Sequence, residues 1–369
     1  MKKILKLILN LTLAKWIFKK PKKKTFLIYD REGFEIFSFY LKKKTFEILD
    51  VRYESINIYV LLFTLFNNGF VNLIINYKIN YIKAVSPKFV ITHVDNNLSF
   101  YQLKNLFSKT IYISIQNGRR DSIFFSKCHD YYLKITKRLS VDYFFVLGKN
   151  EIQRYNKYID AKFYSQGSLK NNYFFLKKEK LNKNNRKKVL FISKKCNFLS
   201  GNQEIIKFNS VYKYCQSKDY QLSLCTRSSF LEEKYYRDRL IKGDWVYIPY
   251  SMQSSYSSIN SYDLIVFTNS TLGLEALIKK KRVVVFPLDF KSLNLFSIKD
   301  YVKKFPKAGP FWISNFEETK SIKLLKKVEN YTHRQWNFII KKYVSDIISY
   351  NPGNKIFLKK LNLHKIYDK

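Results

Sequence analysis

The sequence of 369 residues predicts an α/β protein with two Rossmann-like domains. Short buried-strand patterns alternate with helical stretches along most of the chain, as in parallel sheets covered on both faces. A polar stretch rich in Lys and Asn, residues 172–188, interrupts this alternation, which then resumes. Residues 262–287 show the strand, turn, helix and strand of a βαβ unit. The length is sufficient for two hydrophobic cores.

Residues 1–24 predict a basic amphipathic helix. Its apolar residues keep helical spacing, and lysines gather on another arc. The apolar stretches are shorter than the roughly 20 residues of a membrane span. A signal peptide is one alternative, but Lys15 interrupts its apolar core and lysines follow instead of a cleavage site. A helix packed on the next domain is another. We expect the helix to lie on an anionic inner-leaflet surface, which makes the protein cytoplasmic and peripheral to the inner membrane.

Residues 25–172 predict the first Rossmann-like domain, and residues 189–332 the second. Segment 173–188 is the expected linker, and residues 333–369 form an expected helical tail. A long apolar stretch, residues 55–79, is helix-like. In the first domain, buried-strand patterns occur at residues 25–29, 46–49, 88–92, 110–115 and 143–146. In the second domain they occur at residues 189–193, 220–224, 245–248, 264–267 and 283–286.

The amino-acid composition limits the classes of protein to which this chain can belong. Hydrophobic content of 46% and aromatic content of 18% exclude a disordered chain. The net charge of +40 favours anionic lipid, nucleotides and phosphorylated substrates, although A/T-rich coding bias is an alternative source of the lysines. The chain shows no nucleic-acid-binding motif, so no specific nucleic acid partner is expected. The four cysteines lack CxxC spacing and the four histidines lie far apart, so we expect reduced thiols, no metal and no cofactor.

The most informative segment is the βαβ pattern of residues 262–287. An apolar run from Leu264 to Phe267 ends in a turn, Thr268 to Thr271, and a helical stretch with Gly273 and Glu275 follows. A helix N-terminus at the carboxyl end of a parallel strand favours phosphate. Glu275, about one turn into the helix, could accept hydrogen bonds from sugar hydroxyls. An ordinary crossover with a Ser/Thr cap explains the same pattern without a ligand.

This segment resembles the nucleotide-sugar-binding segment of GT-B-type glycosyltransferases, above all the bacterial surface-carbohydrate (O-antigen or capsule) biosynthesis transferases. The matching residues are Asp263, Ser270, Thr271, Leu272, Gly273, Glu275 and Ala276. The resemblance implies two domains facing a cleft. It also implies a donor site formed by Asn269, Ser270, Thr271, Leu272, Gly273 and Glu275. Further similar motifs occur at residues 95–97, 116–118, 166–171 and 351–354, so the likeness extends over roughly residues 45–355.

Three turns of the first domain follow strands and should share the carboxyl edge of its sheet: residues 93–97, 116–120 and 148–150. They predict a polar, cationic acceptor site with Asn96, Asn97, Gln116, Asn117, Gly118 and Arg119. Asn117-Gly118 is also an ordinary turn signal. Asp95 is the candidate general base, because a carboxylate can take the proton of an acceptor hydroxyl. Its alternative role is to cap the helix that begins near Leu98.

The resemblance gives Arg227 a catalytic role, which is to offset the charge of the departing diphosphate. A solvated arginine is the alternative, and Glu232 and Glu233 fit the polar face of a helix. The chain lacks an Asp-x-Asp pair, and the resemblance implies transfer without a metal. We expect a transferase that moves a sugar from a nucleotide-sugar donor to a surface polysaccharide or lipid-linked glycan precursor. A CDP-polyol phosphotransferase on a similar fold, a non-catalytic glycan-assembly binding protein and a basic nucleic-acid-binding protein are the alternatives.

Overall fold

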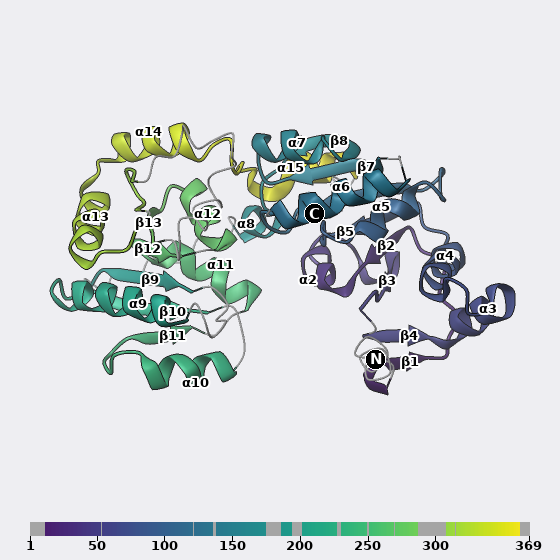
Figure 1. The fold of residues 1–369 in the computed structure, drawn as a ribbon, viewed down its shortest axis with the longest axis horizontal. Coiled ribbons are helices and arrows are strands. Elements are labelled where there is room, and N and C mark those ends of the chain that lie inside the picture. The colour runs from purple at the N-terminus through teal and green to yellow at the C-terminus, as the bar shows by residue number, and fades with distance from the viewer. Residues whose placement is uncertain are drawn as a thin grey trace. The chain divides into compact units, whose positions relative to one another are not determined.

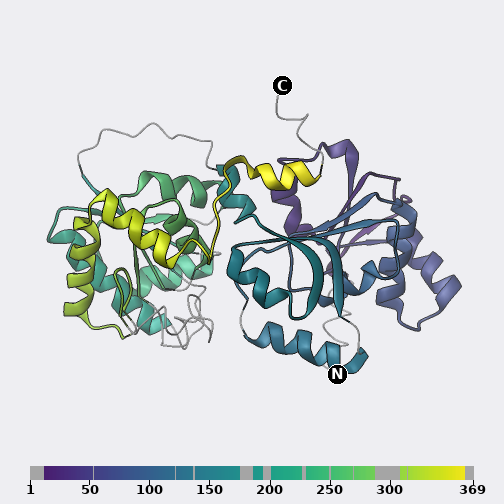
Figure 2. The ribbon, with the colours of Figure 1, turned by 90° about the horizontal axis from the view of Figure 1, so that it is seen from above.

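The computed structural model describes residues 12–52, 54–120, 122–135, 138–174, 186–193, 201–226, 230–248, 251–268, 270–286, 308–313 and 315–361. The chain divides into two compact units, each with its own parallel sheet (Figures 1 and 2). The first unit takes the chain up to Val146, Glu151–Ser165 and the stretch from Phe357 on. The second takes Leu147–Asn150 and Gln166–Ile356. Most of the predicted linker, residues 173–188, lies outside the described residues.

The sheet of the first unit has the order β3-β2-β5-β6-β7-β8, with every neighbouring pair parallel. Its strands are β2 (Phe26–Tyr29), β3 (Phe46–Leu49), β5 (Phe89–Thr92), β6 (Ile111–Ile115), β7 (Leu139–Val146) and β8 (Ile159–Ser165). The five predicted strands are confirmed. β8 was not predicted, because it is an edge strand whose polar residues break the apolar run. The chain order reverses between β2 and β5, which makes the carboxyl ends of these strands the expected ligand edge.

The helices of the first unit correct one prediction. They are α2 (Phe34–Phe37), α3 (Ile58–Asn68), α4 (Leu73–Val85), α5 (Leu98–Lys104), α6 (Ser122–Ile135), α7 (Lys149–Tyr155) and α15 (Lys355–Lys360), the last two shared with the second unit. The apolar stretch 55–79 is not one helix: β4 (Ser55–Asn57) opens it, and α3 ends at Gly69. Gly69 has φ +58°, a left-handed conformation that terminates helices.

The amino-terminal prediction is also corrected. Residues 1–11 lie outside the described part, but Lys15–Ile17 form strand β1, which pairs in parallel with β4. The side chain of Asn57 donates a hydrogen bond to the Lys19 carbonyl at 2.7 Å. The helix predicted over residues 1–24 therefore does not extend through Lys15, because this backbone pairs with β4 instead. In the part of the chain that is described, no single helix has the length and apolar content to cross a bilayer; only α3 and α4 together, bent by 118° at their break, meet those criteria.

The sheet of the second unit has the order β11-β10-β9-β12-β13, again all parallel. The strands are β9 (Lys188–Ile192), β10 (Gln221–Cys225), β11 (Val246–Ile248), β12 (Leu264–Phe267) and β13 (Arg282–Val285), and they confirm the predicted set. The helices are α8 (Leu169–Tyr173), α9 (Gly201–Gln216), α10 (Phe230–Arg239), α11 (Met252–Ser261), α12 (Thr271–Ile278), α13 (Glu318–Asn330) and α14 (His333–Tyr343). The chain order reverses between the first strand, β9, and its neighbour β12. Their carboxyl ends therefore form the topological switch point.

Candidate functional site

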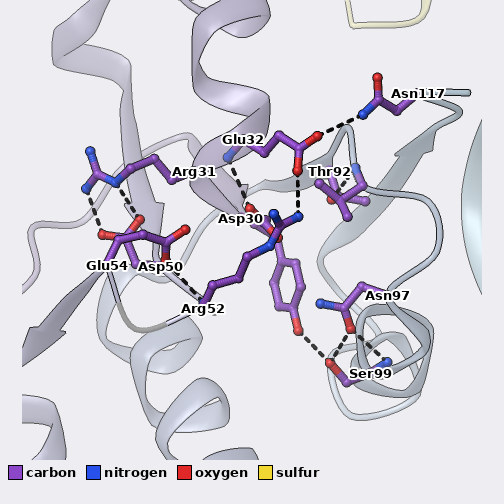
Figure 3. Close-up of polar contacts among 12 residues, drawn as sticks. Asp30, Arg31, Glu32, Asp50, Arg52, Glu54, Thr92, Asn97, Ser99 and Asn117 are labelled. Carbon is purple, nitrogen blue, oxygen red and sulfur yellow. Dashed lines mark hydrogen bonds and ion pairs between the residues drawn. The ribbon is translucent and has the colours of Figure 1, made fainter. Parts of the chain in front are cut away.

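The carboxyl edge of the first unit carries a polar cluster that begins at Asp30 (Figure 3). Asp30 follows β2 with φ 81°, a conformation that costs energy in any residue but glycine. Its buried carboxylate accepts from the Glu32 N–H at 3.0 Å and pairs with Arg52 at 2.9 Å. Glu32 also pairs with Arg52, at 2.7 Å, and accepts from the Asn117 amide at 3.0 Å. Arg52, Glu32 and Asn117 keep partly exposed side chains, so this cluster can meet a ligand.

Burial raises the pKa of Asp30, while the Glu32 N–H and the Arg52 charge oppose the rise. A strained, buried carboxylate at a switch point is a candidate functional group. Asp30, Glu32 and Arg52 were not predicted as site residues from the sequence. The signal was the polar run Asp30-Arg31-Glu32 directly after a buried strand, the same pattern that identified the turns at residues 93–97 and 116–120.

Asp95 lies after β5 and is fully buried. Its carboxylate forms a two-point ion pair with Arg120, whose Nε lies 2.6 Å from Oδ2. It also accepts from the Tyr155 hydroxyl at 2.6 Å and from the Asn117 N–H at 3.0 Å. A general base must reach the proton of its substrate. With both oxygens in hydrogen bonds, Asp95 lacks that reach in this structure, and the contacts favour a positioning role. It does not cap α5.

Asn97 caps α5: its side chain accepts from the Ser99 N–H at 3.2 Å, while Asn96 is exposed next to it. Asn117 connects Asp95 with the cluster at Asp30. Its backbone N–H donates to the Asp95 carboxylate, and its side-chain amide donates to the Glu32 carboxylate. The carbonyl of Gly118 accepts from Gln116 at 3.0 Å, so Gly118 fixes a turn. These residues are brought together as predicted from their shared sheet edge.

Gln116 and Arg119 are buried with Glu151 of α7, which the sequence analysis did not identify. Glu151 accepts from Gln116 at 3.0 Å, from Arg119 Nε at 3.1 Å and from Arg154 at 3.1 Å. Burial lowers the pKa of Arg119, and the Glu151 charge opposes this. Arg119 was predicted as an acceptor-binding cation. In this structure its charge is instead held by an internal carboxylate, because α7 returns Glu151 to the end of β6.

The third predicted turn, residues 148–150, packs elsewhere. A side chain at Gly148 would lie 2.4 Å from the backbone of Ile347, and the Asn150 N–H donates to the Asp346 carbonyl at 3.0 Å. These contacts belong to the second unit. The turn therefore serves the packing of the chain after α14, and it adds no side chain to the cluster at Asp30.

In the second unit, α12 begins at the switch point, as the βαβ pattern predicts. Phe267 pairs with Ile192, so β12 and β9 end side by side. Ser270 is the N-cap of α12, and its side chain makes no capping hydrogen bond. Thr271 and Leu272 form the first turn and are half-buried. Within the described residues, the N–H groups of this turn are therefore not occupied by the Ser270 hydroxyl, and they are available to an anion.

Gly273, predicted as part of the donor site, lies in the same turn. A Cβ atom there would lie 2.2 Å from the ring of Phe267. The packing of α12 on β12 therefore requires a residue without a side chain at this position, whether or not a ligand binds.

We expect Gly273→Ala to lower the free energy of unfolding of the second unit by about 1–3 kcal/mol, the usual cost of overpacking. Thermal unfolding of the variant measures this. Helix propensity alone would make Gly273→Ala more stable by about 1 kcal/mol, so a loss of stability isolates the overpacking. A Gly273→Ala variant as stable as the wild type would contradict the packing explanation.

Glu275 is buried one turn after the N-terminus of α12. Burial raises its pKa, and the hydroxyls of Ser168 and Tyr256 and the charges of Lys170 and Lys279 oppose the rise. Its Oε2 atom has no hydrogen-bond partner in the described part of the chain. A buried, unpartnered carboxylate oxygen costs free energy and is rare in folded proteins. This position therefore fits a group that accepts hydrogen bonds from a ligand.

A buried amide cluster holds α8 next to Glu275. Gln166 donates to the Asn354 side chain at 2.6 Å, and Asn172 donates to the same oxygen at 2.9 Å. Asn171 reaches the Glu275 carbonyl at 3.3 Å. The two motifs at 166–171 and 351–354, which the sequence shows far apart, thus meet in the structure. Their amides fix the helix that places Ser168 and Lys170 near the Glu275 carboxylate.

A second buried carboxylate, Glu204 of α9, joins the ends of β9 and β12. Its side chain accepts from Thr268 at 2.5 Å and from Tyr236 at 2.7 Å, and the Ser193 hydroxyl also donates to it. Ser193 follows β9 and Thr268 follows β12. Glu204 was not predicted as a functional residue, because it does not directly follow a predicted strand and belongs to no recognised motif. Its contacts fix the strand ends from which the first turn of α12 starts.

Two predicted residues, Arg227 and Asn269, lie outside the described residues, and the side chains of Glu232 and Glu233 are not described either. Among described residues, no group of three or more His, Cys, Asp or Glu side chains could hold a metal ion.

Comparison with known proteins places the chain in a family. A family model described as "putative O-antigen biosynthesis protein" matches residues 113–200 and 197–365, which is more than half of the chain. No curated protein matches the chain.

Solved structures with a similar fold include a UDP-N-acetylglucosamine 2-epimerase, with 12% identity and a TM-score of 0.57 over 94% of this chain and 97% of that one. The spinosyn rhamnosyltransferase SpnG, complexed with thymidine diphosphate, has 11% identity and a TM-score of 0.53 over 91% and 99%. The wall teichoic acid polymerase TagF has 13% identity and a TM-score of 0.52 over 98% and 92%. At these identities the likeness concerns the fold, which is GT-B-like with two Rossmann-like parallel sheets. Because the family model matches more than half of the chain, the chain belongs to the family described as "putative O-antigen biosynthesis protein".

Proposed function

We propose that the protein is a glycosyltransferase that moves a sugar from a nucleotide-sugar donor to a surface polysaccharide or a lipid-linked glycan precursor. The donor binds at the second unit, with its diphosphate on the N–H groups at the start of α12 and its hydroxyls on Glu275. The observation that carries this proposal is the buried Glu275 Oε2, which has no hydrogen-bond partner among the described residues and lies one turn from a helix N-terminus that the Ser270 side chain does not cap. Two solved structures of this fold, a UDP-N-acetylglucosamine 2-epimerase and a rhamnosyltransferase complexed with thymidine diphosphate, support the class of donor.

On the acceptor side, we assign binding to the partly exposed cluster of Arg52, Glu32 and Asn117. A carboxylate, a guanidinium and an amide can hold the hydroxyls and anionic groups of a glycan precursor. Asp95 positions this cluster through the Asn117 backbone, and Asp30, which is buried with both carboxylate oxygens in hydrogen bonds, positions Arg52. Arg227 and Asn269, which lie outside the described residues, remain predictions: Arg227 would offset the charge of the departing diphosphate and Asn269 would belong to the donor site.

A non-catalytic glycan-assembly binding protein is the second candidate. The occupied carboxylate of Asp95 favours it, because the predicted base is engaged in four hydrogen bonds. The two candidates differ in turnover: a transferase releases a nucleoside diphosphate in the presence of its acceptor, and a binding protein retains the intact donor. A CDP-polyol phosphotransferase would instead release CMP from a CDP-polyol.

Thermal unfolding with a panel of UDP-, GDP-, CDP- and dTDP-sugars and CDP-glycerol tests donor binding. We expect one nucleotide sugar at about 100 times its Kd to add about 2.7 kcal/mol to the stability of the wild type. The gain should be lost in Glu275→Ala and kept in Glu318→Ala, which removes an exposed glutamate of α13. Release of nucleoside diphosphate from the bound donor with a lipid-linked glycan extract then tests transfer. No stabilisation by any nucleotide at low salt would refute the donor site.

A further inference from the structure

The tip of the first unit formed by α3, α4 and the turn between them exposes large apolar side chains. Phe66 is 92% exposed and Phe70 is 83% exposed, at the end of α3 and in the turn. Leu62, Phe63, Val71 and Ile74 are each at least half exposed beside them. We call these six residues the apolar tip. Isolated exposed apolar residues are normal, but a contiguous group of this kind marks an interaction surface.

The helix that ends in the apolar tip begins beside a basic segment, residues 15–24. β1 pairs with β4, and Asn57 holds the Lys19 carbonyl, so the segment from Lys15 on lies beside the start of α3 (Figure 1). The ammonium of Lys20 lies 5.3 Å from the ring of Tyr59 in the first turn of α3. Lys15, Lys19, Lys22 and Lys23 are exposed as well. No Asp or Glu occurs in residues 12–29 or 55–94, so neither the basic segment nor the α3–α4 hairpin carries a negative charge.

We propose that the apolar tip inserts into the interface of an anionic phospholipid bilayer, with the basic segment on the lipid headgroups. Charge complementarity favours a lipid partner, because exposed aromatic side chains near exposed lysines such as Lys19 and Lys20 fit an anionic lipid surface. The tip projects from a turn, and single rings such as Phe66 and Phe70 can enter the headgroup region without a complementary protein groove. The last turns of α4 cannot insert into the bilayer, because Tyr81, Ile82 and Val85 are buried in the first unit. The inference does not depend on the sugar-transfer proposal.

Vesicle sedimentation of the full chain tests this proposal, with vesicles of phosphatidylcholine alone or with 30% phosphatidylglycerol. We expect binding to the anionic vesicles only. Phe66→Ser/Phe70→Ser should weaken it by about tenfold or more, since each inserted ring contributes a transfer free energy. Lys19→Gln/Lys20→Gln should weaken it by about twenty-five-fold, or about fivefold for each lysine. Added salt should weaken binding of the wild type.

The controls separate insertion from adhesion of a basic protein. Leu133→Ser/Phe338→Ser removes two exposed apolar residues of α6 and α14, and Lys326→Gln/Lys327→Gln removes two exposed lysines of α13. Both should bind like the wild type. Circular dichroism melts establish that each variant folds. Equal binding by Phe66→Ser/Phe70→Ser and the wild type would overturn the proposal. So would a wild-type dimer that dissociates in this variant while neither protein binds vesicles, because the tip would then be a contact between copies.

Discussion

Asp95→Ala should lower the free energy of unfolding of the first unit by about 3–5 kcal/mol, because it leaves the Arg120 charge half-buried without its partner. Tyr155 and Asn117 lose their acceptor at the same time. Arg120→Ala should cost a similar amount, and the double variant should cost much less than the sum, since each single change breaks the same interaction. Denaturant unfolding followed by hydrogen exchange of the β6 amides measures the loss in this unit.

The matched control is Asp130→Ala, an exposed aspartate of α6, which should change stability by less than about 0.5 kcal/mol. A catalytic base kept free for substrate would behave differently: its removal would abolish transfer and leave stability nearly unchanged. Asp95→Ala with wild-type stability would therefore refute the positioning role and restore the predicted general base. For Asp30, the corresponding variant should lose transfer to a greater extent than binding of the donor.

Glu275→Gln should have opposite effects on stability and on ligand affinity. Its folded pKa is raised above the ordinary 4.5, so the unfolded chain gives up this proton first as pH rises. The contribution of the group to stability is thus full below about pH 4.5 and is lost as pH rises through the folded pKa. Glutamine carries no charge, so the variant should be more stable than the wild type at pH 7–8, with the difference vanishing towards pH 4.5. Nucleotide-sugar affinity should fall about 10- to 100-fold, the effect of weakening hydrogen bonds to a charged acceptor.

Thermal unfolding from pH 4.5 to 8, with and without the donor, separates these effects. The carboxylate is also faced by Tyr256 of α11, Lys170 of α8 and Lys279 directly after α12, so Lys170→Gln should enlarge the stability gap. Glu318→Gln, at an exposed position of α13, should show neither effect. If Glu275→Gln is less stable than the wild type at pH 7–8, both carboxylate oxygens of Glu275 have hydrogen-bond donors within the protein. Neither oxygen would then be left to accept a hydrogen bond from a ligand.

The sequence predicts the sheets better than it predicts the site. Buried parallel strands are continuous apolar runs, so both sheets could be recognised and their turns assigned to the carboxyl edges. β8 was not predicted, because this edge strand alternates polar and apolar residues. Lys15–Ile17 escaped because helical spacing within a short segment does not reveal that β4, some 40 residues further on, offers a pairing partner.

The chemistry of the site depends on partners that spacing cannot show. Asp95 and Arg119 were singled out for their residue types, but Arg120, Tyr155 and Glu151 determine what their charges do. Gly273 was predicted as part of the donor site, and spacing could not show that the ring of Phe267 also requires a glycine there. Glu204 gave no signal at all, because its importance comes from Thr268, 64 residues away. Long-range neighbours decide whether a charge is free, and a single sequence does not supply them.

The amide cluster has a consequence for how the chain is made. Asn351 and Asn354 complete contacts begun by Gln166 and Asn172, about 180 residues earlier. In the first unit, the ring of Phe357 packs against Tyr40 and Phe145. Neither unit can therefore complete its packing until residues 351–357 have left the ribosome. During translation, the apolar strands of both sheets stay incompletely covered, and we expect nascent chains halted before residue 351 to depend on chaperones.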